Sequence, residues 1–327
     1  MLIEDLLGPK VLIVSGKGGV GKTTVSAALA LVAARRGRRV CVAEVDRRGT
    51  LSSLLGGGEL TYEPTELLPG IWAMNIDPEH ALTEYLDVQY HMKRISRIFT
   101  SSHFVDYITT AAPGLEDILV LGKIWYLETG RSQGARSGFD TIIVDAPAAG
   151  HMLTFLSAPM GLSDAVRVGP IKRQADRLIE MLRDQRRTRV HLVTLPEEMP
   201  VAETLETAAA VENRIGLNSG AVIANGVYPR LLTRAELVTL DEDGGMQALS
   251  EAGAAAGLKL DAEDFDAMRG YALFLSARRK IQGKHLRALK QQLDDPVIEL
   301  PFLFTSGLAL PDVETLADVL EQAVEEL

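Results

Sequence analysis

The stretch that decides the fold of this chain is SGKGGVGKTT at residues 15–24. It directly follows the apolar run VLIV at residues 11–14 and precedes a helix-prone run from residue 25 to residue 36. A buried strand, a glycine-rich turn and the start of a helix, in this order, are typical of a phosphate-binding loop. The sequence therefore predicts a nucleotide site at the end of its first strand.

This loop supplies the groups that phosphate binding requires. Its glycines allow the backbone N–H groups to turn toward phosphate oxygens, and the start of the next helix adds partial positive charge. We expect Lys22 to reach the β- and γ-phosphates and the Thr23 hydroxyl to bind Mg²⁺. The residues predicted to contact the nucleotide here are Gly16, Gly18, Gly19, Val20, Gly21, Lys22, Thr23 and Thr24.

Strand-like and helix-like runs alternate along the chain, which predicts an α/β fold with a doubly wound, mostly parallel sheet. The predicted strands cover residues 11–15, 40–45, 71–76, 141–144, 190–195, 221–224 and 297–300. The predicted helices between them cover residues 22–36, 171–183 and 201–215. Because the phosphate loop is not repeated, residues 1–327 are predicted to form a single P-loop domain with one nucleotide site.

Two stretches, about 77–138 and 228–294, contain no good strand and are predicted to be helical insertions. Such insertions often form a subdomain that holds a client or partner, although they can also simply cover the sheet. Apolar residues such as Met74, Phe265 and Met268 would then either line a client surface or fill the core. The Gly/Ser-rich segment 130–138 is predicted to be a mobile loop.

Composition limits the classes of function. The net charge of −10 disfavours binding to nucleic acid, which usually needs a basic surface. The single cysteine, Cys41, lies in an apolar run and permits neither an intramolecular disulfide nor a thiol metal site within one chain. The chain shows no signal peptide and no apolar run long enough to span a bilayer. These features together predict a cytoplasmic protein.

A second candidate for the nucleotide site follows the predicted strand at 141–144. Asp145 lies directly at the end of this apolar strand, where phosphate-loop enzymes place a carboxylate that supports Mg²⁺. The segment DAPAAGH at residues 145–151 is a candidate switch that responds to the γ-phosphate. Within it, His151 is either a switch residue or the first residue of a helix.

These motifs resemble those of a known group of ATPases. The stretch KGGVGKT at residues 17–23 is similar to the deviant Walker A sequence of the superfamily that includes ParA, MinD, the nitrogenase iron protein and the arsenite-pump ATPase. DAPAAGH resembles the Asp-Thr-Ala-Pro-Thr-Gly-His box of ArsA and of the eukaryotic ATPase that targets tail-anchored proteins, with one residue missing and alanine in place of threonine. The chain is thus similar to the ArsA-like family, and the stretches VRVGPI at residues 166–171 and LPEEMP at residues 195–200 resemble its bacterial members in particular.

The resemblance implies roles for further residues. Lys17 would cross a dimer interface to the partner's nucleotide, whereas without the resemblance it only adds local positive charge. Asp46 would orient the attacking water, although Arg47 and Arg48 replace the family's Pro-Ala and Asp46 would otherwise cap a turn. Asn225 would read the adenine edge with its amide. Pro301 and Phe302 would form the apolar loop beside the base, and the sequence has no guanine-specific motif, which favours ATP.

The resemblance implies an Mg-ATP-hydrolysing conformational switch. It would act as a homodimer, or as a heterodimer with a paralogous subunit, on a client that is hydrophobic or membrane-bound. An arsenite-type pump subunit is the first alternative, disfavoured because As(III) requires several thiols. A positioning ATPase like ParA or MinD is the second, disfavoured by the acidic terminus at residues 316–327. The basic run at 278–290 either binds an acidic partner or is a solvated helix face.

Overall fold

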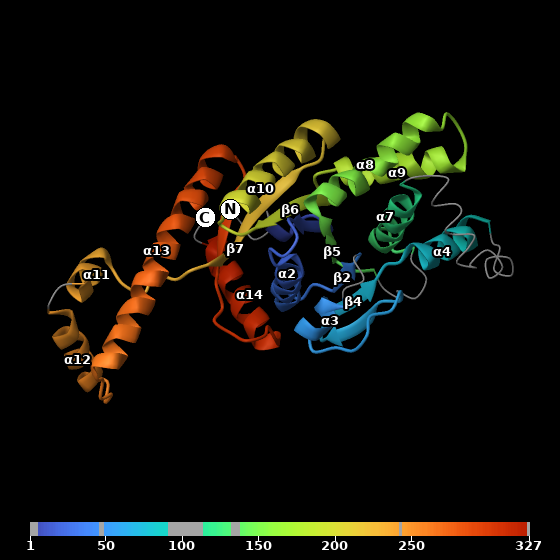
Figure 1. Ribbon diagram of the computed structural model, residues 1–327. Coiled ribbons are helices and arrows are strands. Elements are labelled where there is room, and N and C mark those ends of the chain that lie inside the picture. Colours follow the sequence, from blue (N-terminus) through green and yellow to red (C-terminus); the bar gives the residue numbers. More distant parts are fainter. Residues whose placement is uncertain (1–5, 46–48, 91–113, 132–137, 242–243, 326–327) are drawn as a thin grey trace.

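A computed structural model of the protein describes residues 6–45, 49–90, 114–131, 138–241 and 244–325. Its centre is an eight-stranded sheet in the order β3-β4-β2-β5-β1-β6-β7-β8, parallel throughout except for the β3–β4 pair (Figure 1). The strands are β1 (Val11–Gly16), β2 (Val40–Glu44), β3 (Thr65–Leu68), β4 (Ile71–Asn75), β5 (Thr141–Ala148), β6 (Thr188–Thr194), β7 (Ser219–Val227) and β8 (Val297–Pro301). The predicted α/β fold with a mostly parallel sheet is confirmed.

The seven strands predicted from apolar runs are all present, because strands buried on both faces consist of continuous apolar residues. In β1, for example, Leu12 and Val14 pack into the core on one face of the sheet, while Val11 and Ile13 pack on the other. The strand that the sequence did not reveal is β3, an antiparallel edge strand whose residues are exposed or half-buried. Its residues therefore form no apolar run.

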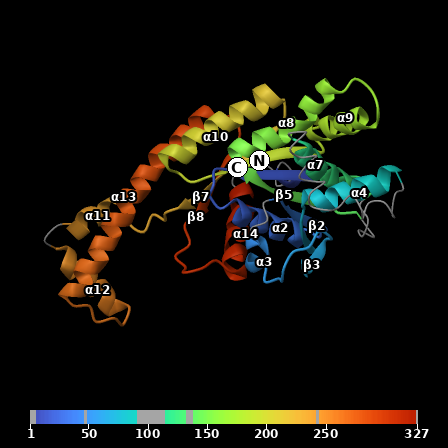
Figure 2. The ribbon, with the colours of Figure 1, turned by 45° about the vertical axis from the view of Figure 1, so that its right-hand side comes forward.

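Helices cover both faces of the sheet (Figures 1 and 2). One face carries α2 (Lys22–Arg35), α3 (Thr50–Leu54) and α14 (Leu310–Glu325). The other carries α7 (Leu115–Glu128), α8 (Ala149–Ala165), α9 (Pro170–Arg183), α10 (Glu198–Ala210) with the π-helical turn η1 (Val211–Ile215), and the C-terminal half of α13 (Ala262–Gln292). The sheet is thus the middle layer of three, which is the doubly wound arrangement expected.

The stretch at 77–138 contributes α4 (Pro78–Tyr90) and α7 to the described structure. Helix α7 is buried from Ile118 to Leu127 and belongs to the core. Met74 is completely buried in that core, so of the two expected uses it serves core packing and not a client surface. The predicted loop at 130–138 lies outside the described residues for positions 132–137.

The stretch at 228–294 contributes α11 (Arg234–Asp241), α12 (Gly245–Ala255) and α13. We call α11, α12 and the N-terminal half of α13 the finger, because they extend away from the sheet in both ribbon views (Figures 1 and 2). Gln282 anchors α13 to the body: its amide donates to the Gly226 carbonyl at 2.9 Å and accepts from the Tyr228 N–H at 2.8 Å. Helix α13 therefore joins the finger to the end of β7.

Among the described residues, no helix has both the length and the apolar character that crossing a membrane requires.

A buried histidine in the central sheet gives the stability of the fold a pH dependence. His191 on β6 is completely buried, and burial lowers its pKa to about 4 even though its Nε2 pairs with the Leu6 carbonyl at 3.0 Å. The unfolded chain, with a histidine pKa near 6.5, therefore binds a proton that the native state excludes between these two values. Stability is retained above pH 6.5 and falls as the pH drops toward 4.

We expect protonation of His191 in the unfolded chain to lower the free energy of unfolding by about 2 kcal/mol between pH 7 and pH 5. Urea unfolding of the parent and of His191→Gln at both pH values isolates the contribution of His191, because the two proteins share all other titrating groups. Between pH 7 and pH 5, the unfolding free energy of the parent should fall by about 2 kcal/mol more than that of the variant. Equal decreases in the two proteins would show that burial does not lower the pKa of His191.

Candidate functional site

The phosphate loop connects the end of β1 to the start of α2 and follows a path that only glycine permits at two points. Gly16 has φ +155°, and a Cβ placed on it would overlap the carbonyl oxygen of Val193 on the neighbouring strand β6. Gly21 has φ +94°, and a Cβ there would overlap the Asn225 amide. The loop is therefore pressed against β6 and β7, which leaves its backbone open toward the carboxyl edge of the sheet.

The two lysines of the loop point to different partners. The Lys22 ammonium lies 3.3 Å from the backbone carbonyl of Lys17, so it lies over its own loop. The Lys17 ammonium instead forms an ion pair with Glu203 on α10 at 2.9 Å, and each of these side chains is 35% exposed. Lys22 is thus placed to bind phosphate in its own chain, whereas Lys17 is directed away from the loop and is accessible.

Thr23 and Asp145, both predicted to support Mg²⁺, are in direct contact. The Thr23 hydroxyl donates to Asp145 Oδ2 at 2.6 Å, and Ser26 on the next turn of α2 donates to Oδ1 at 3.4 Å. The contact follows from the topology, because β1 and β5 are parallel neighbours whose carboxyl ends meet at one edge of the sheet. A hydroxyl and a carboxylate oxygen side by side are the ligand types that Mg²⁺ prefers.

The pKa of Asp145 is set mainly by burial. Burial raises the pKa of Asp145 to about 6, while the Thr23 hydrogen bond and the positive charge of Lys22 oppose the rise. Glu44, which is in register with Asp145 on the adjacent strand β2, adds to the rise. The Asp145 carboxylate is therefore mostly ionised at neutral pH but remains short of positive charge, which a divalent cation would supply.

The segment after Asp145 differs from the expected loop. Strand β5 continues through Pro147 and Ala148, and α8 begins directly at Ala149. The Ser15 hydroxyl donates to the Pro147 carbonyl at 2.7 Å, which ties this candidate switch to the strand that leads into the phosphate loop. His151 is exposed in the first turn of α8.

The residues predicted to hold the base lie at the ends of β7 and β8. Asn225 donates from Nδ2 to the Val20 carbonyl of the phosphate loop at 2.9 Å, so its amide also supports the loop. Pro301 pairs with Val227 across the two strands. The Phe302 ring is 39% exposed and stacks on Tyr228 with centroids 4.8 Å apart. An exposed aromatic surface therefore lies at the ends of β7 and β8, close to Gly226, the residue after Asn225.

The remaining predicted residue, Asp46, lies outside the described residues. The described part of the chain contains no group of three or more His, Cys, Asp or Glu side chains that could hold a metal ion by itself. Mg²⁺ would therefore need phosphate oxygens in addition to Thr23 and the supporting Asp145. The residues present fit such a shared site, because the loop backbone faces the same edge of the sheet.

Two functional candidates were missed by the sequence reasoning. Glu44 is a buried carboxylate at the end of an apolar strand, the same signal that identified Asp145, and it accepts from the Gly49 N–H at 3.2 Å. Glu203 gave no signal, because it is one of several acidic residues on a helix and acquires its partner only through tertiary packing.

Comparison with known proteins agrees with this geometry. Residues 9–175 match the family model described as anion-transporting ATPase. The ATPase BagA of Mycobacterium tuberculosis is 34% identical over 97% of this chain and 94% of its own length. An arsenical pump-driving ATPase of Acidiphilium multivorum is 29% identical over 68% of this chain but only 40% of its own length. The corresponding match in Escherichia coli is 27% identical over 68% of this chain and 40% of that protein.

The phosphate loop, the Thr23–Asp145 pair and these similarities lead to one conclusion: the chain belongs to the anion-transporting ATPase family and is an ATPase.

Proposed function

We propose that the protein is an Mg-ATP-dependent conformational switch that works in the cytoplasm as a dimer and handles a hydrophobic or membrane-bound client. The observation that carries this proposal is the position of Lys17. Its ammonium pairs with Glu203 on the outside of the phosphate loop, where it is accessible and separate from Lys22. A cation in this position serves the loop of a second subunit better than its own.

The residues of the loop divide the work of phosphoryl transfer. Lys22 and the loop N–H groups hold the phosphates, and Thr23, supported by Asp145, holds Mg²⁺, which when bound neutralises charge on the β- and γ-phosphates. Lys17 from the partner adds positive charge where charge develops in the transition state. Asp46 keeps its predicted role in orienting the attacking water.

Two connections support coupling of this site to the rest of the molecule. Ser15 ties the phosphate loop to the segment after Asp145 through the Pro147 carbonyl. Gln282 of α13 binds Gly226 and Tyr228, which lie one and three residues after Asn225. Movements at either end of the nucleotide would therefore reach α8 on one side and the finger on the other.

A cavity of about 270 Å³ between α4, α7 and α9 supports an apolar client. Its lining includes Leu82, Tyr85, Leu86, Leu115, Leu119 and Ile171. An apolar recess on the helical layer is suited to a hydrophobic side chain of a client segment.

The structure weakens both alternatives. Cys41 is completely buried and burial raises its pKa to about 12, so it offers no thiolate to As(III). Helix α14, which a membrane-positioning ATPase would need to release, is held against α2 by ion pairs, including Arg35 with Asp318 at 2.6 Å. Arg36 and Glu321 form a further pair between the same two helices.

The test is Mg-ATP turnover per subunit as a function of protein concentration, with this chain alone. Specific activity that rises and then saturates supports a homodimer that completes its own site. A rate near zero at all concentrations contradicts the homodimer and points to a paralogous subunit. A constant, non-zero rate that persists at dilutions where light scattering shows a monomer contradicts the dimer.

Glu203 offers a second prediction, because its ion pair competes with any role of Lys17 in the partner subunit. The pair is partly exposed, so it is worth up to about 1 kcal/mol. Glu203→Gln should therefore lower the protein concentration that gives half-maximal turnover by about two- to fivefold. Glu206→Gln, which removes the same charge from an exposed position on the same helix, is the control and should leave this concentration unchanged. An identical shift in both variants would refute a specific role for Glu203.

A further inference from the structure

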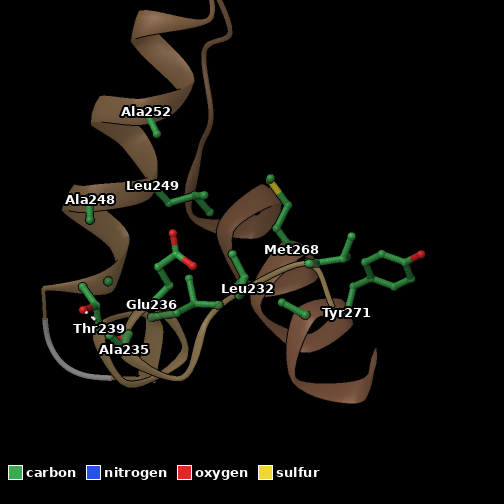
Figure 3. A pocket seen from close by; sticks show the side chains of 13 residues that line it. Leu232, Ala235, Glu236, Thr239, Ala248, Leu249, Ala252, Met268 and Tyr271 are labelled. Atoms are coloured by element: carbon green, nitrogen blue, oxygen red, sulfur yellow. Dashed lines mark hydrogen bonds between the residues drawn. The ribbon is translucent and has the colours of Figure 1, made fainter. Parts of the chain in front are cut away.

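The finger carries an open, mainly apolar pocket that the ATPase site does not use. Its volume is about 660 Å³, within the range of pockets for small molecules. The lining side chains come from α11, α12, α13 and the segment that leads into α11, and they are almost all apolar (Figure 3). They include Leu232, Leu240, Leu249, Ala252, Met268 and Tyr271. The acidic exception, Glu236, is occupied, because it accepts from the Thr233 N–H at 2.7 Å.

A second cavity of about 640 Å³ adjoins the first. Leu231, Leu232 and Ala272 line both cavities, so the two lie next to each other. The second cavity has the opposite chemistry: its lining contains no carboxylate and five cationic side chains. These are Arg230, Arg234, Arg279, Lys280 and Arg287.

The positive charge of this second cavity is poorly compensated. Within the described part of the chain, Arg230, Arg234, Lys280 and Arg287 form no ion pair. Arg279 binds Glu299 through Nη2 at 3.0 Å, but its buried Nη1 has no hydrogen-bond acceptor among the described residues. In a chain of net charge −10, five clustered cations facing one recess are a local reversal of sign. Such a cluster attracts an anion.

From this juxtaposition we infer that the finger, together with the adjoining turns of α13, binds a single-chain anionic lipid. The cationic cavity takes the carboxylate or phosphate headgroup, and the apolar cavity takes the chain. Charge complementarity selects the headgroup, while the mainly apolar lining offers the hydrocarbon chain a surface that it covers from water. A nucleic acid would satisfy only the cationic half, and a neutral hydrocarbon only the apolar half. The site shares no residue with the phosphate loop, so lipid binding can be tested separately from the proposed ATPase cycle.

The test is equilibrium binding of a stearate that carries a nitrobenzoxadiazole fluorophore to the full-length chain, with displacement by palmitate, hexadecanol or inorganic phosphate. Palmitate should displace the probe at least about tenfold more effectively than hexadecanol, because only palmitate carries the charge. Phosphate alone should not displace it. Equal displacement by palmitate and hexadecanol would overturn the assignment of the cationic cavity.

Variants separate the two halves of the site. The double variant Arg234→Gln, Lys280→Gln should weaken palmitate binding at least about tenfold and leave the affinity for hexadecanol unchanged. Lys259→Gln with Lys284→Gln removes the same two charges from exposed positions outside both linings and is the control. Ala252→Phe should fill the apolar cavity and exclude the hydrocarbon chain of the lipid, and Ala248→Phe is a second variant of the same kind. Palmitate affinity unchanged in both the cationic and the cavity-filling variants would refute the proposal.

Two further measurements distinguish a free lipid from a membrane surface, and the finger site from the nucleotide site. Co-sedimentation with phosphatidylglycerol vesicles, without displacement by monomeric palmitate, would overturn the proposal in favour of a membrane surface. Lys22→Ala, which is expected to lose nucleotide, should bind palmitate like the parent. ATP turnover should persist in the finger variants, which shows that their body remains folded.

Discussion

Replacing Lys17 with alanine is expected to leave ATP affinity near that of the parent and to reduce turnover by about a thousandfold or more. Binding persists because Lys22 and the loop N–H groups are independent of the Lys17 side chain, which points to Glu203 on α10. Turnover is lost because a cation supplied across an interface acts on charge that develops only in the transition state.

The measurement pairs equilibrium binding of a fluorescent ATP analogue with steady-state phosphate release at saturating protein. Lys10→Ala, which removes a lysine just before β1, serves as the control and should behave like the parent. A Lys17→Ala chain that binds and hydrolyses ATP at parental rates would show that this lysine only adds local charge.

Replacing Gly16 with alanine is expected to destabilise the fold by more than about 4 kcal/mol and to abolish nucleotide binding. The new Cβ would overlap the Val193 carbonyl oxygen in the central sheet, at a backbone φ of +155°. Neither atom can move away cheaply, because β1 and β6 are paired along their whole length here. The loop and the strand must therefore separate.

Gly18→Ala is the matched control for this substitution. It lies two residues further along the same loop, where a Cβ would meet no atom within 4 Å. Urea unfolding should show Gly18→Ala within about 1 kcal/mol of the parent, and Gly16→Ala unfolded or strongly destabilised. Equal stability of the two variants would contradict the close approach of the loop to β6.

The sequence was sufficient for the parts of the fold that depend on local pattern. Buried parallel strands appear as apolar runs, so β1 and β5 could be found and their carboxyl ends placed at one edge. The contact between Thr23 and Asp145 follows from that placement. Strand β3 could not be found in this way, since an exposed edge strand of four residues carries no such run.

Contacts formed only by tertiary packing remained hidden. Nothing local to Glu203 shows that α10 brings it to Lys17, and nothing local to Asn225 shows that its amide supports Val20. The finger shows the same limit. The basic residues of α13 suggested either a partner site or a solvated face, and only the arrangement of α11 against α13 shows that several of them line one recess.

The central claim, that Lys17 completes the site of a second subunit, is tested most directly by complementation. Lys17→Ala keeps its own phosphate loop but offers no lysine, whereas Lys22→Ala offers Lys17 but loses its own nucleotide. Each variant alone should be inactive. Mixed in equal amounts, they should recover about a quarter of the parental turnover, since about half of randomly paired dimers are mixed and each has one complete site. A mixture as inactive as its two components would contradict the account.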